Sequence, residues 1–401
     1  MLIATAVTIL GLLAGIAAAQ LQGLRLSGVI IVPLSAVYLL KNFATFPVFT
    51  LGIVAAYTSL WIVKRRLLLF GRTLFILSVA VGTLVLVVVF ELVAVGFEPF
   101  GTVSGFELLL SILPGIAAFN LHRLSEEQRV LDAVWSLATL LFLIVVGIGL
   151  VIAIGLTPLA DALPPVLLST ESDIAIAFGL AQASEPIPVV APNWVVLGLF
   201  VGGLVVSEVI RSRYGLRIAG VIVVPVIVLV SFRNAWMLPL WLLTAALVYV
   251  GIQVLHWWTL LYGRVLLSMS VIFGLFVVIS VTPMLPVRNG LLPFFVGILA
   301  GVTAYNVHVI PPTERLAAVL VTCSVLSVTF GLARVVVAPP PSGVLTTVSN
   351  THLVLGVLLT VPGLVVLSRF ERRLPRSRLR CDEQILSLAR NGRRQSDKGG
   401  D

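Results

Sequence analysis

The sequence predicts an all-α, polytopic integral membrane protein with about 13 transmembrane or re-entrant helices in two parallel repeats. Of its 401 residues, 59% are hydrophobic and only 11% are charged, whereas soluble domains carry about 25% charged residues. Apolar runs of about 20 residues, enough to cross a hydrocarbon core of about 30 Å, recur along the chain. These runs lack a two-residue alternation, which favours helices over a barrel.

The second observation is an internal repeat. Residues 23–72 begin GLRLSGVIIVP and return, without a gap, as residues 215–264, which begin GLRIAGVIVVP. Sixteen of the fifty paired positions are identical. A second segment, residues 115–129, returns as residues 301–315. The paired residues include types that unrelated apolar helices do not share in register: Arg25 with Arg217, Gly28 with Gly220, Pro33 with Pro225, Asn42 with Asn234, Arg72 with Arg264, Gly115 with Gly301, Asn120 with Asn306, and His122 with His308. The chain is therefore predicted to be a duplication.

The repeat sets the expected organisation along the chain. We expect membrane repeat A at 1–156, an external linker at 157–190, membrane repeat B at 191–338, an extra transmembrane span at 339–368 and a cytoplasmic basic tail at 369–401. The expected spans cover residues 2–19, 26–40, 46–63, 73–95, 106–119 and 130–154 in repeat A; 194–210, 218–232, 236–255, 265–281, 291–305 and 316–337 in repeat B; and 352–367. An even number of spans in each copy makes the repeats parallel.

Proline and glycine interrupt two of these spans in each copy. Span 26–40 is expected to kink at Pro33, because a proline inside a helix removes a hydrogen bond and clashes with the preceding turn. Pro114 and Gly115 are expected to interrupt residues 106–119. The helix-breaking set is Gly28, Pro33, Pro114, Gly115, Gly220 and Pro225. Such breaks serve packing, or they line a polar cavity that satisfies the freed backbone groups.

The basic residues orient the chain in the cell membrane. If every span crosses and the N-terminus lies outside, 22 of the 26 Lys and Arg residues fall on the inner side or in the C-terminal tail. By the positive-inside rule, this predicts an external N-terminus and a cytoplasmic C-terminus. The tail is expected to form a short helix from Asp382 to Ala389. The basic residues that give the net charge of +9 lie in short loops and in this tail. We therefore expect the chain to contact the lipid bilayer and not nucleic acid.

Motifs of common enzyme classes are missing from the sequence. It contains no GxxxxGK[ST], HExxH, GxSxG or CxxC pattern, so an ATPase or protease is not expected. Two cysteines and four histidines do not suggest a metal site or a disulfide framework. We therefore expect no cofactor, no metal and no catalytic residue, and we do not expect the chain to be an enzyme on its own.

Repeat-related polar residues are the candidates for binding a substrate or partner. The asparagines after the second span are typical of turns, or they line a path. The later asparagine pair would line a path or, equally well, cap a helix, and the histidine pair suits a structural hydrogen bond. The arginines would contact lipid phosphate, an anionic substrate or a partner carboxylate. The candidate set is Arg25, Asn42, Arg72, Asn120, His122, Arg217, Asn234, Arg264, Asn306 and His308. Glu91 and Asp132, ionisable groups in apolar segments, are further functional candidates.

With these residues in place, the sequence resembles the poly-gamma-glutamate biosynthesis protein PgsC/CapC family. The resemblance lies in the Gly-rich entry to an apolar VVP-like segment (residues 28–33), the LYGR-like motif (69–72) and the PGIxAxxxxR-like segment (114–123). Family members are about one repeat long, so this chain resembles two fused copies. Copy two departs at Ala300, which stands where copy one has Pro114, and it lacks the basic cluster at 64–66.

The resemblance implies a non-catalytic membrane subunit of a complex that makes and exports a capsule-like polymer. In that reading, a cytosolic, Mur-ligase-like, ATP-dependent amide ligase makes the poly-γ-glutamate chain. This subunit then anchors the ligase or passes the polyanionic polymer outward. The residues themselves leave another reading open, a stand-alone secondary transporter of an anionic solute built from two parallel repeats.

Overall fold

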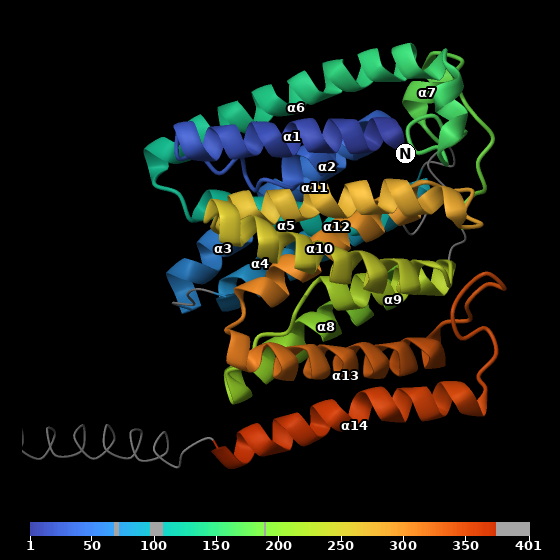
Figure 1. Cartoon of the computed structure of the whole chain (residues 1–401). Coiled ribbons are helices and arrows are strands. Elements are labelled where there is room, and N and C mark those ends of the chain that lie inside the picture. The colour runs from blue at the N-terminus through green and yellow to red at the C-terminus, as the bar shows by residue number, and fades with distance from the viewer. Residues whose placement is uncertain (68–71, 97–106, 188–189, 374–401) are drawn as a thin grey trace, which may run out of the picture.

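The computed structural model describes residues 1–67, 72–96, 107–187 and 190–373, and it consists of helices that lie side by side (Figure 1). The long helices of the first half are α1 (Leu2–Leu21), α2 (Ile31–Lys41), α3 (Thr45–Leu67), α4 (Arg72–Gly96), α5 (Glu107–His122) and α6 (Glu126–Gly155). Those of the second half are α8 (Asn193–Tyr214), α9 (Val223–Arg233), α10 (Met237–Thr259), α11 (Gly263–Val281), α12 (Leu291–Val309) and α13 (Pro312–Val336), and α14 (Asn350–Arg373) follows.

These helices confirm the predicted fold class. Within the described ranges, nine helices are long and apolar enough to cross a membrane. Their apolar side chains face outward as well as inward, as helices immersed in lipid require. The tail helix predicted from Asp382 to Ala389 lies outside the described residues.

The prediction that Pro33 and Pro225 kink their helices is wrong. Helix α2 begins at Ile31 and α9 at Val223, so each proline is the third residue of its helix. In the first turn a backbone N–H has no acceptor within the helix, and a proline there costs little. The two prolines therefore mark helix starts, and α2 and α9 are shorter than the sequence suggested.

Helix α5 likewise continues through the two residues that were predicted to interrupt it. It includes Pro114 and Gly115 and ends at His122. The glycine brings two helices together: a Cβ at Gly115 would lie 2.5 Å from the carbonyl oxygen of Ser78 in α4. In the second half, a Cβ at Gly301 would lie 2.6 Å from the carbonyl oxygen of Ser270. Both glycines are close-packing positions of a kind common in membrane helices.

The two halves use the same internal packing. Helices α3, α4 and α5 pack pairwise in the first half, as α10, α11 and α12 do in the second. Helix α2 packs on α1 and α6, as α9 packs on α8 and α13. Individual bonds also recur: Arg129 donates to the Tyr57 hydroxyl at 3.1 Å, and Arg315 donates to the Tyr249 hydroxyl at 3.1 Å.

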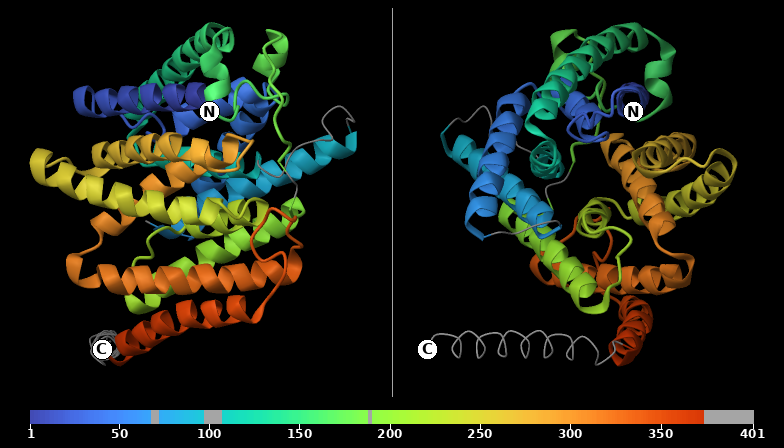
Figure 2. Two further views of the ribbon diagram at one scale, coloured as in Figure 1. Left: turned by 45° about the vertical axis from the view of Figure 1, so that its right-hand side comes forward. Right: turned by 90° about the vertical axis from the view of Figure 1, so that its left-hand side faces the viewer.

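Contacts between the halves are reciprocal. Helix α1 packs on α11, and its counterpart α8 packs on α4, the counterpart of α11 (Figure 2). An exchange of equivalent surfaces is the pattern of an isologous, two-fold pair. The main hydrophobic core accordingly continues through both halves.

The segment between the halves folds over one end of the bundle. It contains a 3₁₀ turn, η2 (Pro158–Ala162), and a short helix, α7 (Asp173–Ala177). Its Glu171 pairs with Lys41 at 3.3 Å, and its Glu185 pairs with Arg288 at 3.3 Å. This acidic segment therefore contacts basic residues of both halves, and we call the end that it covers the capped end.

Helix α14 lies at the edge of the bundle (Figure 1) and packs mainly on α13. The Ser327 hydroxyl donates to the carbonyl oxygen of Gly356, and Ser324 contacts the next turn of α14. Most of the remaining α14 surface is apolar and exposed, which suits a helix that faces lipid on its outer side.

Candidate binding site between the two halves

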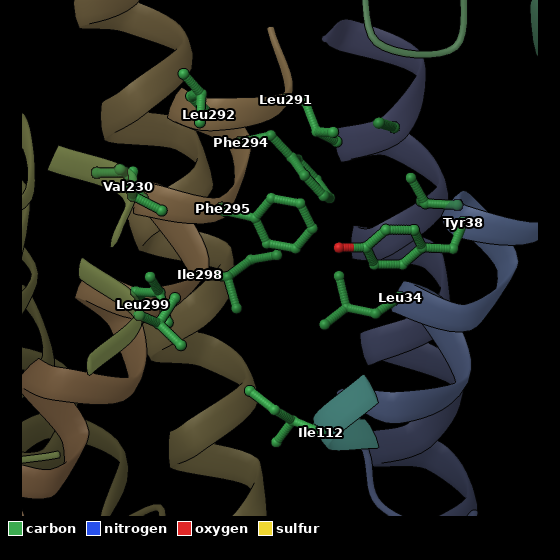
Figure 3. Close-up of a cluster of buried hydrophobic side chains, with 14 of the residues drawn as sticks. Leu34, Tyr38, Ile112, Val230, Leu291, Leu292, Phe294, Phe295, Ile298 and Leu299 are labelled. Carbon is green, nitrogen blue, oxygen red and sulfur yellow. The ribbon is translucent and has the colours of Figure 1, made fainter. Parts of the chain in front are cut away.

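A cavity of about 320 Å³ lies between α2 and α5 of the first half and α9, α11 and α12 of the second. Equivalent residues of the two repeats line it, and Figure 3 shows one such pair, Ile112 and Ile298. The pairs are Ile30 with Ile222, Ile31 with Val223, Leu34 with Val226, Ile112 with Ile298, Leu113 with Leu299, and Ile116 with Val302. The lining is thus apolar. It does not form the polar cavity that the sequence offered as one explanation of the interrupted helices.

Aromatic rings from both halves meet where Phe295 lines the cavity. Tyr38 of α2 and Phe295 of α12 approach with ring centroids 5.6 Å apart, and Phe294 packs against Phe295 (Figure 3). Tyr38 lies one turn from Lys41, which contacts the capping segment. This aromatic contact is therefore built from both halves by side chains of large apolar area.

Arginines lie at the opposite end, which we call the arginine end. Arg25, from the loop before α2, and Arg264, from the first turn of α11, both line the cavity and are half-buried. The guanidinium of Arg264 lies within electrostatic range of Arg25, Arg123 and Asp132. Neither Arg25 nor Arg264 forms an ion pair in the part of the chain that the structure describes. Positive charge from both repeats thus converges beside an apolar space.

The loop that carries Arg25 is held by Asp132. This side chain is fully buried in α6 and accepts hydrogen bonds from the backbone N–H groups of Arg25, Leu26 and Ser27 at 2.6, 2.7 and 2.8 Å. Leu26 and Ser27 adopt left-handed backbone angles, with φ of 45° and 51°. The carboxylate therefore positions Arg25, and the three donors occupy both of its oxygens.

The second half holds its loop by different chemistry. The position equivalent to Asp132 is Ala318, and the Ala219 N–H donates instead to the Thr322 hydroxyl at 3.0 Å. Arg217, the counterpart of Arg25, is exposed and does not line the cavity. Arg72, the counterpart of Arg264, begins α4, and its side chain lies outside the described part. The cavity is therefore symmetric in its walls and asymmetric at its arginine end.

The asparagines have local structural contacts. The side-chain oxygens of Asn42 and Asn234 accept the N–H of Ala44 and Trp236, each at 2.9 Å, in the turn that follows α2 or α9. Asn120 lies inside the last turn of α5, so the prediction that it caps the helix is wrong. Its amide donates to the Ser27 carbonyl at 3.0 Å, which ties α5 to the Arg25 loop.

Three remaining polar candidates lie along the ends of α5 and α12. Asn306 is half-buried within α12, which continues to Val309, so it is not a C-cap either. His122 and His308 are buried and pack edge-on against the rings of Tyr57 and His256, respectively. Within the described residues, no group of three His, Cys, Asp or Glu side chains could hold a metal ion.

Glu91, the other ionisable candidate, lies in α4 and accepts a hydrogen bond from the Asn193 amide at 3.0 Å. This bond joins α4 to the start of α8, at one of the two reciprocal contacts between the halves.

Gly28 has φ of 122°, and a Cβ there would lie 2.9 Å from the Asn120 amide nitrogen. Gly28 thus lets the Arg25 loop approach α5.

The fold and this site define a two-repeat helical membrane protein with an apolar cavity between the repeats. A family model described as "Capsule biosynthesis CapC" matches the chain twice, over residues 10–130 and 202–316. The chain belongs to this capsule biosynthesis family, which confirms the predicted tandem duplication of a PgsC/CapC-like unit. No curated protein and no solved structure matches the chain.

Proposed function

We propose that this protein is the non-catalytic membrane subunit of a poly-γ-glutamate synthesis and export complex, and that it anchors a cytosolic, ATP-dependent amide ligase. Membership of the capsule biosynthesis family carries the proposal. The family supports a role in making a capsule polymer. The polymer's identity and the ligase are the parts that we propose.

The arrangement of charge supports an anchoring role. Lys64, Arg65 and Arg66 are exposed together at the end of α3, and Arg123 is exposed directly after α5. Poly-γ-glutamate is a polyanion, and arginine binds carboxylates through two parallel hydrogen bonds. A nascent chain leaving the ligase would therefore meet cations at this face of the membrane.

The apolar cavity does not suit a polyanion. Moving a carboxylate from water into a cavity lined by isoleucine, leucine and valine leaves it without hydrogen-bond donors, which costs several kcal/mol or more per charge. We therefore assign this subunit to anchoring the ligase and receiving the polymer. Any export step along this subunit would need a polar route elsewhere. The same argument weighs against a secondary transporter whose anionic solute binds in this cavity.

Co-purification tests the anchoring role. The tagged full-length chain, isolated from membranes of its native host, should retain a soluble ligase that forms γ-glutamyl polymer from glutamate and ATP. Replacing Lys64, Arg65 and Arg66 together by glutamine should reduce both the retained ligase and the cellular polymer yield at equal subunit abundance.

The matched control replaces Lys41 and Arg288, which lie at the capped end, by glutamine. This variant should retain the ligase. The proposal fails if no ATP-dependent ligase accompanies the wild-type chain, or if deleting the gene leaves polymer yield unchanged.

A further inference from the structure

We propose that the cavity between the repeats binds the hydrocarbon tail of an anionic membrane lipid whose phosphate headgroup is held by Arg25 and Arg264. This inference goes beyond the proposed function, because it assigns a ligand to a site that neither ligase anchoring nor polymer synthesis requires.

The walls of the cavity select a hydrocarbon tail. Its size, about 320 Å³, is within the range of roughly 300–1,000 Å³ that is typical of ligand pockets. Apart from Arg25, Asn120 and Arg264, the residues that line it are Gly28 and apolar side chains. An apolar cavity of about 150 Å³ already stays dry and accepts hydrocarbon guests. The bilayer supplies acyl chains at high local concentration, so a tail is the natural occupant of this space.

The arginine end selects an anionic headgroup. Arg25 and Arg264 approach from different repeats and repel each other beside a region of low dielectric constant. Asp132 is the nearby carboxylate, but it already accepts three backbone N–H groups. A phosphate placed between the two guanidinium groups would relieve this repulsion and could accept paired hydrogen bonds from each.

The asymmetry of the two repeats predicts one headgroup site. Asp132 and Asn120 hold the Arg25 loop against the cavity through the Arg25, Leu26 and Ser27 N–H groups and the Ser27 carbonyl. The Arg217 loop has no equivalent carboxylate, and Arg217 is exposed. Arg217 therefore provides a matched control for Arg25 and Arg264, since it has the same side chain in the same repeat motif.

The test measures lipid retention by native mass spectrometry. The full-length chain is reconstituted in phosphatidylcholine nanodiscs and titrated with dodecyl phosphate as the probe. Inorganic phosphate and dodecyl maltoside, which supply the headgroup charge and the tail separately, are titrated in parallel. We expect the wild-type chain to retain one dodecyl phosphate, with at least tenfold weaker retention of either comparison compound.

Two variants separate the headgroup from the tail. Arg264→Gln should weaken dodecyl phosphate binding about tenfold, because it removes a charged donor to the phosphate. Val302→Trp should reduce binding by filling the cavity without removing a charge. Arg217→Gln should bind like wild type. A thermal melt of each variant identifies those that fold, and Ile116→Phe replaces Val302→Trp if the latter does not.

Any one of the following results would overturn the proposal. Equal retention of inorganic phosphate would show a free anion site, and equal retention of dodecyl maltoside would show unselective apolar binding. Displacement of the probe by a short γ-glutamyl oligomer would assign the cavity to the polymer. A wild-type chain that retains the ligase but no dodecyl phosphate would refute this inference alone. A wild-type chain that binds dodecyl phosphate but retains no ligase would refute the anchoring role alone.

Discussion

At the scale of single residues, the most informative contrast is between Asp132 and Ala318. The two positions are equivalent in the repeats, yet only the first supplies a carboxylate. A buried charge needs full hydrogen bonding, and Asp132 obtains it from three consecutive N–H groups. The sequence indicated that Asp132 was a functional candidate because it lies in an apolar segment. The structure shows that it acts by fixing the loop that presents Arg25.

We predict that Asp132→Ala destabilises the protein strongly. The substitution leaves three buried N–H donors without an acceptor and removes the support for the left-handed Leu26 and Ser27. A hydrogen bond to a charged group contributes about 1.5–3 kcal/mol, so the free energy of unfolding should fall by about 3 kcal/mol or more. Unfolding of the purified protein in sodium dodecyl sulfate measures the change.

The second repeat supplies the control for this prediction. Thr322→Ala removes a neutral acceptor for the Ala219 N–H and a donor to the Ala318 carbonyl within the same helix. It should cost only about 1–2 kcal/mol. Equal losses from Asp132→Ala and Thr322→Ala would mean that the carboxylate contributes no more than a hydroxyl does.

At the scale of helices, glycines set the distance between neighbours. Gly115 and Gly301 place α5 against α4 and α12 against α11, with no room for a Cβ. In a bilayer, the hydrophobic effect does not drive helices together, so close backbone packing contributes much of the association energy. These contacts hold the helices that form two walls of the cavity.

We predict that Gly115→Ala destabilises this pair of helices. The new Cβ would lie 2.5 Å from the Ser78 carbonyl oxygen and from the Val79 Cα, so the backbones must separate. We expect a loss of about 1–3 kcal/mol, as for other overpacked sites. Gly149→Ala in α6, where nothing lies within 4 Å of the new Cβ, should leave stability unchanged or slightly higher. A higher melting temperature for Gly115→Ala than for wild type would contradict the close-packing account.

At the scale of the whole molecule, charge separates along the helix direction. The capped end pairs acidic residues of the connecting segment with Lys41 and Arg288, while most other Lys and Arg residues lie toward the arginine end or in the tail. From the positive-inside rule, we predict that the arginine end and the C-terminus face the cytoplasm. The same face would then meet the cytosolic ligase and the inner lipid leaflet.

We predict that reporters at the two ends will show opposite locations. A fusion after Asp401 should be active only with a reporter that works in the cytoplasm. A reporter inserted in the capping segment after Thr170 should be active only outside the cytoplasm. External activity of the fusion after Asp401 would reverse the orientation and move the ligase-binding face to the capped end.

Patterns in the sequence were enough to establish the class of the protein and its duplication. Long apolar runs exclude a soluble fold. They indicate membrane helices, because a helix satisfies its own backbone groups in lipid and the runs lack the alternation of a barrel. The paired Gly, Pro, Asn and Arg residues identified the repeat, because they recur at the same spacing in both copies. The predicted helix starts near Pro33 and Pro225 were inaccurate, because a proline restricts the backbone in the same way whether it begins a helix or bends one.

How the repeats meet, and what lies between them, could be learned only from the three-dimensional packing. In a helix surrounded by lipid, both the inward and the outward faces are apolar, so the pattern of residues does not reveal which side chains line a cavity. Arg25 and Arg264 approach because α1 packs on α11 and α8 on α4. The residues next to either arginine in the sequence do not predict these contacts between the halves. The Asp132 contacts likewise join α6 to a loop more than 100 residues earlier. Such contacts depend on three-dimensional packing, which pairs residues without regard to their separation along the chain.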